Sequence, residues 1–71
     1  MNKLTEQQLE TYWDVIDSRK QPDGQRFGQW LFNVLYELYP DYADTIRGTH
    51  VDPFYDSKRV WQFTLHISNI D

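Results

Sequence analysis

The stretch from Gln25 to Tyr39, "QRFGQWLFNVLYELY", carries apolar side chains on most sides of a helix. One stripe recurs at helical spacing, and further apolar residues widen it beyond a single face. A helix that is apolar on most sides is buried by several neighbours. We therefore expect a helix over 25–39 at the centre of the fold. The stripe consists of Phe27, Trp30, Leu31, Val34 and Leu38, widened by Phe32, Leu35, Tyr36 and Tyr39.

Gly28 stands inside this predicted helix. Glycine in a helix interior costs about 1 kcal/mol relative to alanine. Its missing side chain allows another backbone to approach closely. We expect such an approach at Gly28, with the preceding helix as the suggested neighbour.

The residues before the central stretch predict a first helix over 5–19. Thr5 followed by Gln8 forms a capping box, and Leu4 with Leu9 forms a hydrophobic staple. The cluster "QPDG" after this helix predicts a turn. Apolar side chains recur at helical spacing through Leu9, Tyr12, Trp13 and Ile16.

A short third helix is predicted over 40–47. Pro40 suits its first position, and Asp41 and Asp44 lie early, as the helix dipole prefers. Gly48 fits the left-handed conformation that ends many helices.

The next residues, "THVDPFYD", predict a structural corner. Asp52 and Pro53 are typical of a helix start, so "DPFY" is expected to form one helical turn. We expect Phe54 and Tyr55 to plug the core. A role in binding a partner is the alternative for this segment.

Arg47 is the expected fastening of this corner. Its guanidinium can hold Asp52 or Asp56 in a bidentate ion pair. The predicted structural corner therefore consists of Arg47, Gly48, Asp52, Pro53 and Phe54.

The C-terminal segment 59–70 fits two structures. Alternating Trp61, Phe63, Leu65 and Ile67 indicate a strand, whereas Val60, Phe63, Ile67 and Ile70 form a helical stripe. The chain offers no second strand to pair with it, so we favour a fourth helix. A strand would instead pair with a second copy or a partner protein. The predicted fold is a single all-α domain over 1–71, a small bundle of three to four short helices.

Composition excludes several classes of protein. The chain has no cysteine, so disulfides and thiolate metal sites are ruled out. A net charge of −4 argues against binding a phosphate backbone or an anionic membrane surface. No apolar run approaches the ~20 residues of a membrane span. We expect a soluble, cytoplasmic protein.

No pattern in the sequence indicates catalysis. His50 lies near Asp52 and Asp56, and His66 lies in the tail, but these spacings match no metal motif. The serines and threonines lack a nucleophile elbow, and the glycines form no phosphate loop. We expect no enzymatic activity, no metal and no cofactor.

Aromatic side chains are the best candidates for binding a partner. They make up 17% of the residues, and exposed tyrosine and tryptophan often dominate interfaces. Most of the rings are expected to be at least half-buried, with the remainder forming a recognition patch. The candidate partner-binding residues are Tyr36, Tyr39, Tyr42, Tyr55 and Trp61.

Three motifs carry a resemblance: "RFGQWLFNVL" followed by Pro40, then "IRGT", then "DPFY". Together they resemble small uncharacterised proteins of tailed phages and bacteria. The resemblance covers under half of the chain. It implies a viral or bacterial origin, and it brings no catalytic or ligand residues with it.

Three functions are compatible with these patterns. The first is a phage-encoded protein that modulates a host protein by binding it. The second is an acidic nucleic-acid mimic, and the third is a self-associating subunit that forms a homodimer through paired tail strands. Direct nucleic-acid binding ranks last. The mimic would present Asp14, Asp17, Glu37, Asp41 and Asp44 in place of phosphates.

Overall fold

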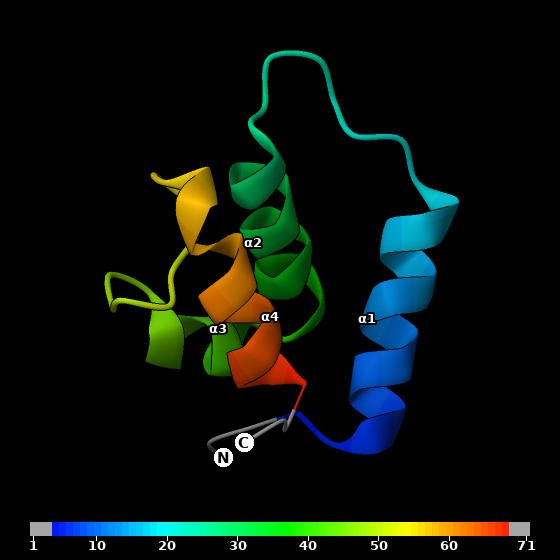
Figure 1. The fold of residues 1–71 in the computed structure, drawn as a ribbon. Coiled ribbons are helices and arrows are strands. Elements are labelled where there is room, and N and C mark those ends of the chain that lie inside the picture. The colour runs from blue at the N-terminus through cyan, green and yellow to red at the C-terminus, as the bar shows by residue number, and fades with distance from the viewer. Residues whose placement is uncertain (1–3, 69–71) are drawn as a thin grey trace.

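The computed structural model describes residues 4–68, and this range contains four α-helices, one 3-10 turn and no strand. The predicted all-α bundle is confirmed (Figure 1). None of the helices in the described range is long and apolar enough to cross a membrane. The helices are α1 (Glu6–Ser18), α2 (Phe27–Leu38), α3 (Pro40–Ile46) and α4 (Val60–Ile67), with the 3-10 turn η1 (Ser57–Arg59) before α4.

Helix α2 lies at the centre of the bundle, as its apolar sequence predicts. It contacts α1, α3 and η1, and Figure 1 shows it between α1 on one side and the later segments on the other. Its side chains form much of the core because they point to several neighbours at once. Those that are buried are Trp30, Leu31, Phe32, Val34 and Leu35.

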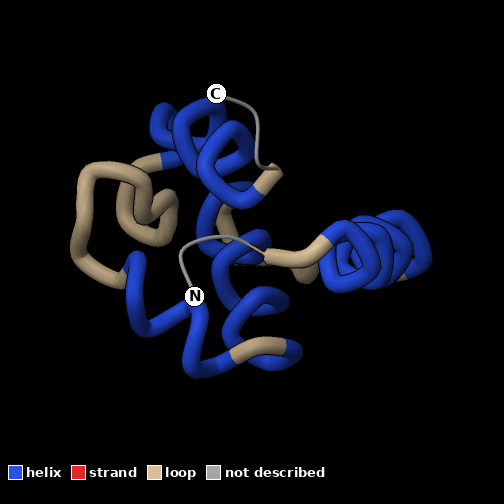
Figure 2. Tube along the Cα trace, turned by 90° about the horizontal axis from the view of Figure 1, so that it is seen from below, coloured by secondary structure: helices blue, strands red, loops and turns tan. Residues whose placement is uncertain are grey.

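Helix α1 begins at the predicted capping box. The Thr5 amide donates to Gln8 Oε1 (2.9 Å), and the Gln8 amide donates to Thr5 Oγ1 (3.1 Å). The helix stands to one side of the other elements (Figure 2). Two tyrosine hydroxyls join it to α2 and to the residue after α2: Tyr12 donates to the Leu31 carbonyl (2.7 Å), and Tyr39 donates to the Gln8 carbonyl (3.2 Å).

Replacing Tyr12 with phenylalanine tests this attachment. Burial raises the pKa of the Tyr12 phenol far above its usual range, so the phenol ionises near pH 10 only in the unfolded chain. Above pH 10 the unfolded state therefore binds fewer protons than the folded state, and stability falls as pH rises. Tyr12→Phe should lose about 1 kcal/mol at pH 7 with the hydrogen bond. The variant also lacks this alkaline loss, so its deficit should shrink at pH 11.

Urea unfolding of both proteins at pH 7 and pH 11 measures this difference. An equal deficit at the two pH values would contradict the burial of the Tyr12 hydroxyl.

The C-terminal segment is helical over Val60–Ile67, so the helix that we favoured is confirmed there and the strand alternative is wrong. The side chains of Phe63 and Ile67 are fully buried against the core. The alternation that indicates a strand arises because two apolar residues lie outside the helical stripe, the exposed Trp61 and the half-buried Leu65. Ile70, which extends the predicted helical stripe, lies outside the described residues.

Gly28 allows the close approach that its position predicts, but the neighbour is Pro53 and not α1. A Cβ atom at Gly28 would collide with the Pro53 carbonyl oxygen. The Gly28 amide also donates to Ser57 Oγ (3.2 Å). Segments 25 residues apart in the sequence are thereby held in direct backbone contact.

Gly28→Ala should therefore destabilise the protein, although alanine is the better helix former by about 1 kcal/mol. The added methyl group meets backbone and not a flexible side chain, and forced displacement of packed backbone costs ~1–3 kcal/mol. Gln29→Ala, at the next position of α2, is the control and should change stability by less than about 0.5 kcal/mol. Urea unfolding measures both variants. A stabilised Gly28→Ala protein would show that Pro53 does not pack against α2.

Candidate functional site

Residues 47–56 form the corner, which connects α3 to η1. Gly48 takes the predicted left-handed conformation (φ 76°) after α3. Asp52 then accepts two backbone hydrogen bonds, from the Gly48 amide (2.7 Å) and from the Phe54 amide (2.9 Å). Its side chain is the organising group of the corner, and the residue is only 6% exposed.

The predicted ion pair of Arg47 with Asp52 or Asp56 is wrong. Two nearby backbone amides occupy the Asp52 carboxylate, as aspartate side chains commonly do in turns. Arg47 instead lies 3.6 Å from Asp44, one helical turn earlier. Asp56 lies 4.0 Å from Arg59.

The predicted helical turn at "DPFY" is also wrong. The bond from the Phe54 amide to Asp52 makes an Asx turn, and the Asp56 amide donates to the Pro53 carbonyl (3.3 Å). This bend turns Tyr55 outward, where it is 83% exposed and does not plug the core. Phe54 is half-buried and packs edge-on against Phe32.

Two arginines fasten the corner through backbone carbonyls. Arg26 donates to the Phe54 carbonyl (2.8 Å), and Arg59 donates to the Thr49 carbonyl (3.2 Å). Together with the Gly28–Pro53 contact, these bonds fix the corner against α2 and η1. The exposed Tyr55 therefore stands on a well-fastened backbone.

Asp52→Ala should lower the unfolding free energy by about 2–4 kcal/mol, because two hydrogen bonds to a carboxylate are lost together. Asp52→Asn should lose less, since its amide oxygen still accepts one of the two bonds. Asp44→Ala removes an exposed carboxylate and should cost under about 1 kcal/mol. Denaturant unfolding of the three variants checks this order, which a similar loss for Asp44→Ala and Asp52→Ala would contradict.

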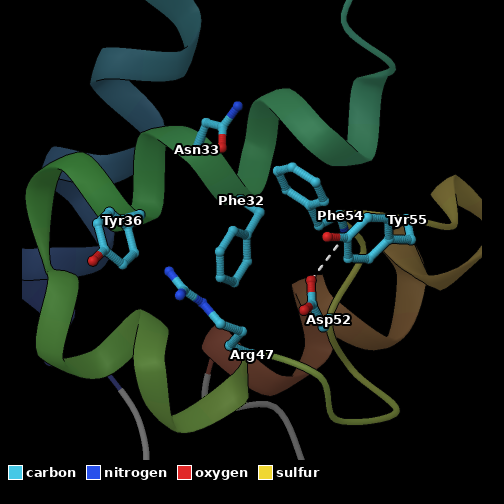
Figure 3. A pocket seen from close by; sticks show the side chains of 7 residues that line it. All are labelled: Phe32, Asn33, Tyr36, Arg47, Asp52, Phe54 and Tyr55. Atoms are coloured by element: carbon cyan, nitrogen blue, oxygen red, sulfur yellow. Dashed lines mark hydrogen bonds between the residues drawn. The ribbon is translucent and has the colours of Figure 1, made fainter.

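The corner and α2 enclose a surface hollow of about 300 Å³, the aromatic hollow (Figure 3). In Figure 3, Phe32 lies between Tyr36 and Arg47 on one side and the Phe54 and Tyr55 rings on the other. The lining is thus drawn from α2 and the corner. It consists of Phe32, Asn33, Tyr36, Arg47, Asp52, Phe54 and Tyr55.

Arg47 supplies the positive charge of the aromatic hollow. Its guanidinium carbon lies 4.8 Å from the centre of the Tyr36 ring and 5.9 Å from that of Phe32. Such cation–π stacking orients a guanidinium without using its N–H donors. The Arg47 side chain is 56% exposed, and its Nη2 atom lies 3.6 Å from Asp44 Oδ1.

The other predicted partner-binding residues lie outside the hollow. Tyr42 is buried, and its ring stacks against His66. Tyr39 is half-buried, and its hydroxyl donates a hydrogen bond to the Gln8 carbonyl of α1. Trp61 is 68% exposed in the first turn of α4. The structure brings together only Tyr36 and Tyr55 of the five, and Phe32, Asn33 and Arg47 join them.

Five of the eleven acidic residues fall into two contrasting settings, an ion pair and a group on one helix. Glu37 forms an ion pair with Arg19 (2.7 Å), and hydrogen bonding to Arg19 lowers the pKa of Glu37. The second group lies on α1 at spacings of three and four residues, which place it on one helical face. Its members, all exposed, are Glu6, Glu10, Asp14 and Asp17.

The arrangement is suited to binding. Among residues 4–68 no group of three or more histidine, aspartate or glutamate side chains could hold a metal ion. The aromatic hollow offers apolar ring surface, one amide and one guanidinium. The sequence favours Tyr36 and Tyr55, but it cannot show Asn33 and Arg47 beside them, because that grouping depends on how the corner folds.

Comparisons with protein-family models, with curated proteins and with solved structures gave no match to this chain.

Proposed function

We propose that this chain is a non-enzymatic protein that binds another protein through the aromatic hollow. The observation that carries the proposal is the exposure of large rings at a fastened site. Tyr55 is 83% exposed and Tyr36 is 40% exposed, whereas most other rings of the chain pack in or against the core. Tyrosine and arginine are among the residues that most often dominate protein interfaces.

The dimensions of the hollow favour a protein over a small molecule. Its volume of about 300 Å³ is at the lower limit of small-molecule sites, which are usually more enclosed. A protein segment can cover the rings around the hollow as well as its floor. The fastened corner reduces the ordering cost of such binding, because the rings already stand on a fixed backbone.

We further propose that the partner is a bacterial protein and that the chain is phage-encoded. The support is the resemblance of "RFGQWLFNVL", "IRGT" and "DPFY" to small phage and bacterial proteins. On this proposal the chain modulates a component of its host, and it acts in the host cytoplasm.

Affinity capture with the full chain tests the proposed function. The immobilised protein is exposed to a lysate of the bacterial host, and captured proteins are quantified by mass spectrometry. We expect a stoichiometric partner that binds the wild type and is lost with Tyr55→Ala. Truncating a dominant interface tyrosine typically costs ~2 kcal/mol or more, about 30-fold in affinity.

Trp61→Ala is the comparison variant, because Trp61 is similarly exposed but lies away from the hollow. It should retain the partner. Loss with Trp61→Ala alone would move the binding surface to α4, and recovery of no stoichiometric partner would contradict the proposed function.

The nucleic-acid mimic is the second candidate, and the exposed acidic face of α1 favours it. Two of the acids predicted for the mimic, Asp14 and Asp17, lie on that face. Two others, Glu37 and Asp44, lie beside arginines that offset their charge. In this case double-stranded DNA would compete with the chain for the captured partner, and substitution of Asp14 and Asp17 by asparagine would abolish capture.

A further inference from the structure

We infer that the occupant of the aromatic hollow is an internal acidic segment of the partner, with a side-chain carboxylate bound by Arg47 and an apolar side chain set among the rings. This inference rests on the proposed function and specifies the chemistry of the partner at the same site.

The Arg47 guanidinium is stacked on two rings and only loosely paired with a carboxylate. Within the described residues its ion-pair contact is to Asp44, at 3.6 Å, which is longer than the ~2.7–2.9 Å of a charged hydrogen bond. Tyr36 and Phe32 hold the guanidinium plane through their ring faces. An oriented guanidinium on a side chain that is more than half exposed fits a planar carboxylate in the bidentate geometry.

The exposed charged side chain that lines the aromatic hollow is positive. Asp52 is the acidic member of its lining, but both carboxylate oxygens accept backbone hydrogen bonds and the residue is almost completely buried. Arg47 therefore presents the exposed positive charge among the lining residues, and Asp44 beside it offsets part of that charge. Although the chain carries a net charge of −4, the guanidinium N–H donors at this site fit an anionic group and not a cationic one.

Two adjacent hollows indicate that the occupant is an extended segment. A second hollow of about 210 Å³ lies on the corner and shares Tyr55 and Asp52 with the first. Arg59 lines this second hollow. A segment that places its carboxylate at Arg47 and crosses the Tyr55 ring can enter both hollows. We assign the carboxylate to a side chain, because a segment that continues on both sides of Arg47 covers more of the rings around the hollow.

A randomised twelve-residue peptide library tests this inference without knowledge of the partner. The peptides are displayed with both ends covalently continued, so that no free terminal carboxylate is present. Panning against the full-length protein should enrich sequences with aspartate or glutamate beside a large apolar residue. The best clones, prepared as synthetic peptides with blocked ends, should bind Arg47→Met at least tenfold more weakly than the wild type.

Arg19→Met is the matched control, because Arg19 is an exposed arginine outside the aromatic hollow. It should leave peptide affinity unchanged. Replacing the acidic residue of the peptide by its amide should reproduce the loss caused by Arg47→Met, and combining the two changes should add little. Circular dichroism confirms that each variant is folded.

Three results would overturn the inference. Peptides that depend on Tyr55 but are neutral or basic, and bind Arg47→Met normally, would leave the hollow as a binding surface with a different occupant. Tighter binding of a twelve-residue oligothymidylate at the hollow would assign it to single-stranded nucleic acid. Failure of every peptide to depend on either Tyr55 or Arg47 would overturn the proposed function as well.

Discussion

The contact between the Gly28 backbone and the Pro53 carbonyl is the constraint on which the candidate site depends. No side chain fits between these two segments, so the corner lies directly on α2. The contact sets the distance between Phe32 on the helix and Phe54 on the corner, whose ring centroids lie 6.0 Å apart. A larger separation would leave Tyr55 on a loose loop, without a hollow beside it.

Local signals in the sequence were enough to predict most of the fold. The capping box at Thr5 and Gln8 involves neighbouring residues, and the structure contains it. Gly48 similarly needs only its own conformation to end α3. The central place of α2 follows from its apolar circumference. The tail was ambiguous because alternation and helical spacing share Phe63 and Ile67, and the absence of a partner strand correctly favoured the helix.

The site was less predictable, because it depends on competition for hydrogen bonds and on distant contacts. The sequence predicts a pair of Arg47 with Asp52 or Asp56, because these opposite charges lie close along the chain. In the structure, nearby backbone amides donate to the Asp52 carboxylate instead, and Arg47 stacks on Tyr36. The sequence predicts a close backbone approach at Gly28. It does not predict that Pro53, 25 residues away, is the neighbour, because no local pattern links the two residues.

The acidic face of α1 has a consequence for how other molecules approach. Helix α1 and the corner lie at opposite ends of the molecule in both views (Figures 1 and 2), and Arg26, Arg47 and Arg59 are gathered toward the corner. The exposed acids of α1 therefore set up a negative field at the end of the molecule away from the corner, where Arg47 and Arg59 each lie beside an aspartate. Screening limits its reach to ~8 Å at physiological ionic strength, so the field acts only in the last stage of an encounter. There it repels an incoming carboxylate from α1, so that approach to the corner is favoured.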